Sequence, residues 1–92
     1  MDPREMTNRQ LGDVLLATTR PCASSPELFF ATDDETESAR RMREQAASVL
    51  CAECPARRLC FEYATRTEPE HGFWAGCTAE EIRMFNQLGE VA

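Results

Sequence analysis

Five cysteines in a chain of only 92 residues constrain the fold more than any other feature of this sequence. A chain of this length buries a small core, and such domains are commonly stabilised by disulfides, a metal site or a partner. Four of the cysteines form the pattern C-x28-C-x2-C-x5-C, made up of Cys22, Cys51, Cys54 and Cys60. This spacing predicts one site that joins an early segment of the chain to two later ones.

The chemistry of such a site depends on the compartment. The sequence contains no apolar run as long as a membrane span, and its start, Met1 to Glu5, has no signal-peptide core, so we expect a cytoplasmic protein. In a reducing cytosol, spaced cysteines are more often metal ligands or redox thiols than permanent disulfides. The spacing alone leaves open a structural zinc site and an iron–sulfur cluster, although zinc ribbons usually bring two C-x2-C pairs rather than one.

Helix-starting and helix-ending signals predict an all-α fold, a small bundle of about four to five short helices. Two capping-box sequences, one from Thr7 to Gln10 and one from Thr78 to Glu81, begin the first and last helices, and Gly89 is expected to end the last. No segment alternates in hydrophobicity as a strand would. The predicted ranges are about 8–18 for the N-terminal helix, about 79–88 for the C-terminal helix, and about 22–77 for the cysteine-rich core of a single domain over 1–92.

Two further helices are predicted around the C-x2-C pair. One begins near Asp33 or Asp34 and delivers Cys51 at its C-terminal end, and the next begins at Cys54-Pro55. The expected apolar face of the first consists of Ala39, Met42, Ala46, Val49 and Leu50. The N-terminus of the second points its free N–H groups at the cysteine loop, which favours negatively charged thiolates there.

A short aromatic turn, bounded by Gly72 and Gly76, precedes the last helix. Its Trp74 fits two roles, a core residue that anchors the turn or an exposed anchor for a partner protein. The adjacent residues Phe29 and Phe30 pose the same choice, because both cannot easily point into one small core.

Together these motifs resemble the WhiB-like family of small bacterial regulators, and the resemblance covers about Cys22 to Phe85. Its elements are the four cysteines in this order, Pro26-Glu27-Leu28-Phe29-Phe30 after the first of them, Cys54-Pro55, and the G-x-W-x-G turn at Gly72 to Gly76. The resemblance implies a 4Fe–4S cluster held by Cys22, Cys51, Cys54 and Cys60. In that family the cluster senses O2 and nitric oxide, and its loss allows the cysteines to form disulfides.

The function implied by the resemblance is redox- or nitric-oxide-responsive control of transcription, not enzymatic catalysis. It implies that Phe29, Phe30 and Trp74 contact the C-terminal region of the principal sigma factor in the RNA polymerase holoenzyme. Two alternatives are a thiol–disulfide oxidoreductase acting through Cys51 and Cys54, and a zinc-stapled protein-interaction module. The sequence has no phosphate-binding loop, no Ser/His/Asp arrangement and no H-E-x-x-H helix, so no catalytic residue and no small-molecule substrate are predicted.

The sequence departs from the family pattern in three places. Phe73 and Ala75 replace a small aliphatic residue and a glycine, which makes the turn bulkier. Cys77 lies at no ligand position of the family and is expected to be a small buried hydrophobe. Beyond Thr78 the only basic residue is Arg83, and the formal net charge is −6, so we expect DNA contact to be weak or indirect.

Overall fold

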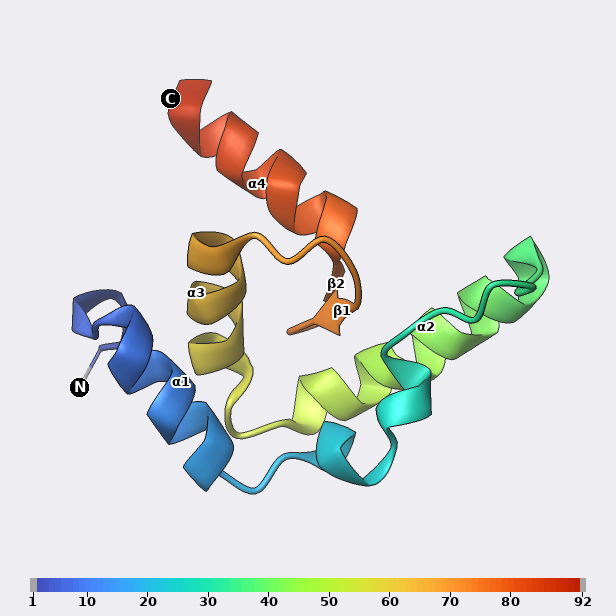
Figure 1. Cartoon of the computed structure of the whole chain (residues 1–92), viewed down its shortest axis with the longest axis horizontal. Coiled ribbons are helices and arrows are strands. Elements are labelled where there is room, and N and C mark those ends of the chain that lie inside the picture. Colours follow the sequence, from blue (N-terminus) through green and yellow to red (C-terminus); the bar gives the residue numbers. More distant parts are fainter. Residues whose placement is uncertain (1, 92) are drawn as a thin grey trace.

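The computed structural model describes residues 2–91, and the side chains of residues 2–89. Four α-helices, three short 3-10 helices and one two-stranded ribbon make up the described fold (Figure 1). The α-helices are α1 (Asn8–Ala17), α2 (Glu37–Glu53), α3 (Arg57–Thr67) and α4 (Ala79–Val91). The smaller elements are η1 (Pro3–Glu5), η2 (Pro21–Ser24), η3 (Pro26–Leu28), β1 (Phe73–Trp74) and β2 (Cys77–Thr78). The predicted all-α class is confirmed, with the ribbon as a small addition.

Both predicted capping boxes are present and begin their helices as expected. The amide of Gln10 donates to Thr7 Oγ1 at 3.1 Å, and the Thr7 amide donates to Gln10 Oε1 at 2.8 Å. The same reciprocal pair joins Thr78 and Glu81, at 3.0 Å and 2.8 Å. These bonds satisfy N–H groups that lack a partner inside the first turn of a helix.

The end of α4 differs from the prediction. Gly89 does not stop the helix, which continues to Val91. Gly89 is not among the glycines with positive φ, and no atom lies within 4 Å of the position where its Cβ would be. A glycine ends a helix when the chain turns into the left-handed conformation and packs a following apolar residue back on the helix. Gly89 does not adopt that conformation.

The start and the buried face of α2 were both predicted wrongly. The helix begins at Glu37, because Thr36 caps it by accepting the Ala39 amide at 3.1 Å. Its buried residues are Ala47 and Cys51, whereas Met42 is 70% exposed. Arg43, Ala47 and Cys51 follow one another at i, i+4 spacing and face the rest of the molecule, while the N-terminal end of α2 extends away from the core (Figure 1).

The ribbon is the element that sequence patterning missed. Its strands pair antiparallel with Trp74 opposite Cys77, and the two loop residues, Ala75 and Gly76, have φ values of 55° and 86°. Positive φ at both central residues is typical of the tight hairpin turns that fit the twist of paired strands. Strands of two residues are too short to show an alternating pattern. Ala75 also carries a strain of about 1–2 kcal/mol, because a side chain is disfavoured in this conformation.

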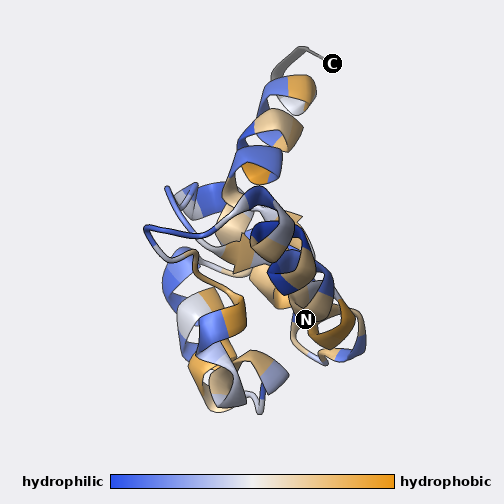
Figure 2. Ribbon diagram, turned by 90° about the vertical axis from the view of Figure 1, so that its right-hand side faces the viewer, coloured by the Kyte–Doolittle hydropathy of each residue, from blue (hydrophilic) through white to orange (hydrophobic). Residues whose placement is uncertain are grey.

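The core lies where the ribbon meets η2, η3 and the end of α2. Its central cluster is Phe29, Ala47, Cys51 and Phe73, with Cys22, Leu28 and Leu50 packed against it. Phe73 fills this core by contacting Phe29, with ring centroids 6.3 Å apart. α1 packs against α3, while α4 extends away from the rest of the molecule (Figures 1 and 2). None of the described helices combines the length and the apolar character needed to cross a bilayer.

Candidate metal centre

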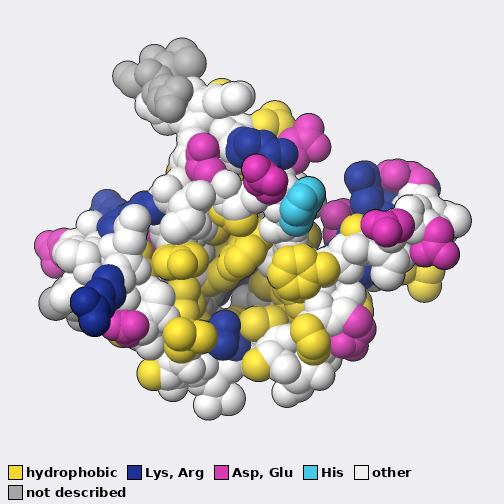
Figure 3. Space-filling model, viewed as in Figure 1, with side chains coloured by type: hydrophobic (Ala, Val, Ile, Leu, Met, Phe, Trp, Pro, Cys, Tyr) yellow, Lys and Arg dark blue, Asp and Glu magenta, His cyan; other side chains and the backbone are white. Residues whose placement is uncertain are grey.

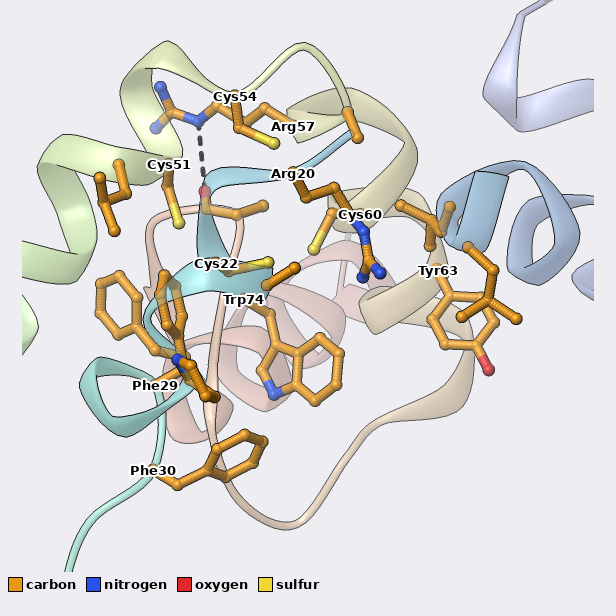
Figure 4. A pocket seen from close by; sticks show the side chains of 18 of the residues that line it. Arg20, Cys22, Phe29, Phe30, Cys51, Cys54, Arg57, Cys60, Tyr63 and Trp74 are labelled. Carbon is orange, nitrogen blue, oxygen red and sulfur yellow. Dashed lines mark hydrogen bonds between the residues drawn. The ribbon is translucent and has the colours of Figure 1, made fainter. Parts of the chain in front are cut away.

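The four predicted ligand cysteines line one cavity of about 360 Å³ (Figure 4). Each comes from a different local setting. Cys22 lies in η2, Cys51 in the last turn of α2, Cys54 caps that helix, and Cys60 lies in the first turn of α3. α3 begins at Arg57 and not at Pro55 as predicted, so a short turn separates Cys54 from the helix that carries Cys60. The structure therefore brings η2, which is distant in sequence, to the turn that joins the end of α2 to the start of α3.

The thiols surround this space and do not converge on a point. Among the described residues, no group of three or more His, Cys, Asp or Glu side chains is placed to hold a single metal ion. All five cysteines are free thiols. Four thiols are a donor set that both zinc and iron–sulfur clusters use.

Burial sets the protonation of the deepest thiols. Burial, and to a lesser extent the nearby thiols of Cys51, Cys22 and Cys54, raises the pKa of Cys60 to about 11. Burial also raises the pKa of Cys51, again with contributions from Cys54 and Cys22. These thiols are therefore protonated near neutral pH when no cation is bound. Metal binding has to displace their protons, since the thiolate is the ligand form.

The aromatic turn provides one wall of the cavity and polar groups that face the sulfurs. The backbone amide of Gly76 acts to lower the pKa of Cys51, and that of Ala75 acts to lower the pKa of Cys60. Arg57 fixes this turn by donating from Nε to the Ala75 carbonyl at 3.3 Å (Figure 4). Gly76 has φ +86°, which favours glycine, and a Cβ there would lie 2.9 Å from an Arg57 guanidinium nitrogen and displace the end of that side chain.

The three predicted partner residues take different positions. Phe29 is buried in the core at 6% exposure, whereas Phe30 is 51% exposed at the mouth of the cavity. Trp74 is half-buried; its ring lines the cavity, and its Nε1 donates to the His71 carbonyl at 2.8 Å. A Cβ on Gly72 would lie 2.8 Å from Trp74 Nε1 and 2.9 Å from a ring carbon of Phe30. The rings of Trp74 and Phe30 therefore both lie against Gly72.

An ion pair that sequence reasoning missed holds the Phe30 segment on α2. Arg43 Nε donates to Glu35 Oε2 at 2.6 Å, and Arg43 also donates to the Leu28 carbonyl at 3.1 Å. This bond to Arg43 holds the pKa of Glu35 below its usual range. The sequence does contain a signal for this role of Arg43. It lies four residues before Ala47 and therefore on the buried face of α2.

A second missed residue lies inside the cavity. Arg20 is one of its lining residues, and its Nε is buried without a hydrogen-bond partner among the described residues. Figure 3 shows hydrophobic side chains around a hollow in this face, with a basic side chain at its edge. An unpaired buried cation donor beside four thiols fits an anionic occupant. Thiolate-ligated iron–sulfur groups have that charge, so the donor set and the orphaned nitrogen both suit such a group.

Cys77 lies apart from this cavity. It lines a separate, shallow depression together with Arg58, Phe61 and Phe85. Partial burial raises the pKa of Cys77, and the nearby Glu81 raises it further. The fifth cysteine is therefore a half-buried thiol that does not line the cavity shared by the other four.

The fold and the site together define a small helical domain built around a four-thiol cavity. The chain belongs to the WhiB family of transcription factors, whose family pattern it matches over residues 17–85. That match includes all four cavity cysteines and the aromatic turn.

Relatives within this family are transcriptional regulators by name. The chain is 39% identical over 67 residues to the transcriptional regulator WhiD of Streptomyces coelicolor. These 67 residues are 73% of the chain and 58% of WhiD. It is 35% identical over 54 residues to the redox- and pH-responsive transcriptional regulator WhiB3 of Mycobacterium tuberculosis, covering 59% of the chain and 53% of WhiB3. For the redox-responsive WhiB3 of Mycolicibacterium smegmatis the identity is 31% over 62 residues, covering 67% and 65%. The chain thus spans between half and two thirds of the length of these relatives.

Proposed function

We propose that this chain is a redox-responsive regulator of transcription that holds a 4Fe–4S cluster through Cys22, Cys51, Cys54 and Cys60. The observation that carries the proposal is the gathering of these four thiols around one cavity whose remaining lining is mostly apolar. The names of the relatives, which describe redox-responsive transcriptional regulators, support the same function. Such a cluster supplies a redox-active group whose stability depends on oxidants and on solvent access.

The residues of the chain link this group to the surface. Cys22, Cys51 and Cys60 belong to η2, α2 and α3, so ligation by all of them fixes the relative positions of these elements. Phe29 and Phe30 follow Cys22 closely, and Trp74 lines the same cavity. Release of the cysteines would loosen this arrangement and change the aromatic surface at the cavity mouth.

That surface is the proposed contact for a partner protein. Phe30 and Trp74 present their rings at the mouth of the cavity, and Phe29 supports them from the core. Aromatic side chains in such positions often dominate binding energy at protein interfaces. We assign the C-terminal region of the principal sigma factor, within RNA polymerase holoenzyme, as the partner. The formal charge of −6 favours DNA contact that is weak or made through the polymerase.

Phe30→Ala tests this surface, with Phe85→Ala as its matched control. The two rings are almost equally exposed, at 51% and 53%, but Phe85 lies on α4 and outside the cavity. Each variant is co-expressed with the C-terminal region of the sigma factor, and cluster absorbance and affinity are measured on the same preparation. We expect Phe30→Ala to weaken binding by about 2 kcal/mol, or roughly thirtyfold, because a central aromatic anchor is lost.

The cluster absorbance of both variants should match that of the unchanged chain. Equal binding by Phe30→Ala and the unchanged chain would remove Phe30 from the interface. Equal weakening by Phe30→Ala and Phe85→Ala would argue against a surface confined to the cavity mouth.

A further inference from the structure

Arg20 is an unusual arginine in this molecule. Within the described part of the chain, its Nε is the one buried side-chain nitrogen or oxygen that has no hydrogen-bond partner. It also forms no ion pair with any described carboxylate. The Arg20 residue as a whole is half-buried, but a buried donor nitrogen without an acceptor costs free energy, so a partner from outside the protein would stabilise it.

The other arginines near the core show the contrast. Arg57 lines the same cavity but donates its Nε to the Ala75 carbonyl at 3.3 Å. Arg43 donates its Nε to Glu35 at 2.6 Å. Arg66 donates its Nε to Glu62 at 2.8 Å. Each of these Nε atoms has an oxygen acceptor in the protein, and Arg20 is the exception.

The surroundings of Arg20 identify the chemistry of the missing acceptor. The residues that line the cavity include four cysteines and no aspartate or glutamate. In Figure 4 the Arg20 side chain points into the cavity, between the labelled side chains of Cys60 and Tyr63. Besides the Tyr63 hydroxyl and backbone carbonyls, which are neutral, the acceptors that this lining offers are sulfur atoms. The acceptor that matches the charge of Arg20 is therefore a sulfur, either of a cysteine thiolate or of a group that the thiolates hold.

We propose that Arg20 is a positioning residue that donates from its guanidinium to a sulfur of the cysteine-ligated cluster and thereby raises the reduction potential of that cluster. The inference rests on the proposed function, because it needs an anionic 4Fe–4S cluster in this cavity. A cluster that takes up one electron from an external reductant gains one negative charge. A nearby fixed cation stabilises the more negative state more strongly, and net charge and hydrogen bonds to sulfur are known determinants of cluster potentials.

The test is a potentiometric titration of the full chain after anaerobic reconstitution with iron and sulfide. Arg20→Met removes the charge and keeps an apolar stem, and Arg20→Lys keeps the charge. Arg41→Met is the control, since it removes the same charge from an exposed position on α2 outside the cavity. Midpoint potential and the rate of iron release to a chelator are measured by visible absorbance.

We expect Arg20→Met to disfavour the reduced state about tenfold, which is a shift of about 59 mV to lower potential for a one-electron couple. It should also release iron faster. The midpoint potential of Arg20→Lys should stay near that of the unchanged chain, and the potential of Arg41→Met should equal it. A structural arginine would alter folding stability and leave the potential where it was.

The outcomes separate this inference from the function on which it rests. If the unchanged chain assembles no cluster, the proposed function fails and the inference fails with it. If the unchanged chain and Arg41→Met assemble it, but Arg20→Met keeps the same potential, the inference alone is overturned. Equal shifts in Arg20→Met and Arg20→Lys would also overturn it, because charge would not be the cause. If Arg20→Met holds no cluster, retention by Arg20→Lys supports the inference and loss in both variants overturns it.

Discussion

The thiol cavity and the C-terminal helix α4 both contain many apolar residues, but the cavity region buries them whereas most of α4 leaves them exposed. The cavity draws its lining from α1, η2, η3, α2, α3 and the ribbon, and it combines apolar groups with thiols. α4 attaches through its first turn, where Ala79 and Ile82 are buried, while Phe85 and Leu88 are 53% and 69% exposed (Figure 2). Local signals therefore suffice to form α4, whereas the cavity depends on contacts between distant segments.

The apolar residues around the cavity therefore pack in the core, whereas those along the outer part of α4 lie on the surface. α4 does touch α3, since Phe61 and Phe85 pack edge to face with centroids 5.0 Å apart, and Asn86 donates to the Thr65 carbonyl at 2.8 Å. These contacts lie at the edge of the molecule, where water still reaches the rings. Substitutions should therefore cost much more at the base of α4 and around the cavity than along the outer part of α4.

The largest stability effect in this comparison is expected at the base of α4. Ile82 is fully buried, with 0% exposure, so Ile82→Ala should lower the free energy of unfolding by about 2–5 kcal/mol through lost burial and a cavity. Leu88→Ala, two turns further along the same helix, should change it by less than about 0.5 kcal/mol. Denaturant unfolding followed by circular dichroism measures both. Comparable losses in the two variants would mean that the outer part of α4 packs on the domain.

A pair of glycine substitutions should give a smaller effect with opposite signs in the two regions. Gly72 has φ +102°, and a Cβ there would lie 2.8 Å from Trp74 Nε1, so Gly72→Ala should destabilise by about 1–3 kcal/mol. Gly89 is helical with open space around it, so Gly89→Ala should stabilise by about 0.5–1 kcal/mol. Thermal unfolding of the two variants provides the comparison. A stabilising Gly72→Ala would contradict the close contact of the two aromatic rings with this glycine.

A third comparison concerns the caps at the start of α4 and of α1. Thr78 and Thr7 each accept an amide of the first turn, so Thr78→Ala and Thr7→Ala should each cost about 1 kcal/mol. Serine at either position keeps the acceptor and should recover most of that loss. The midpoints of urea unfolding of the alanine and serine variants measure these losses. If Thr78→Ala lowers the free energy of unfolding by much more than Thr7→Ala does, the ribbon, and not the cap alone, depends on the Thr78 hydroxyl.

The parts of this fold that the sequence predicted are those set by neighbouring residues. The capping boxes of α1 and α4 have their partners within three residues, and both were predicted correctly. The buried face of α2 depends on which half of the helix the rest of the chain covers, and that prediction was wrong. The ribbon was missed because its strands are two residues long.

The candidate site divides in the same way. The spacing of the cysteines predicted that Cys22, Cys51, Cys54 and Cys60 share one site, and the structure brings all four to one cavity. Their role as ligands stays a prediction. Arg20 escaped sequence reasoning because nothing near it in the chain distinguishes it from the other arginines; only the fold shows that its Nε lacks an acceptor.

The central claim is that the four cavity thiols, and not the fifth thiol, hold an iron–sulfur cluster. Its most direct test is the iron and sulfide content of Cys60→Ser and Cys77→Ser, both reconstituted anaerobically beside the unchanged chain. Cys60 lines the cavity, and Cys77 lies outside it in the separate depression. We expect Cys77→Ser to retain the iron, sulfide and visible absorbance of the unchanged chain, and Cys60→Ser to lose most of all three. A Cys60→Ser variant that keeps the cluster while Cys77→Ser sheds it would contradict the account.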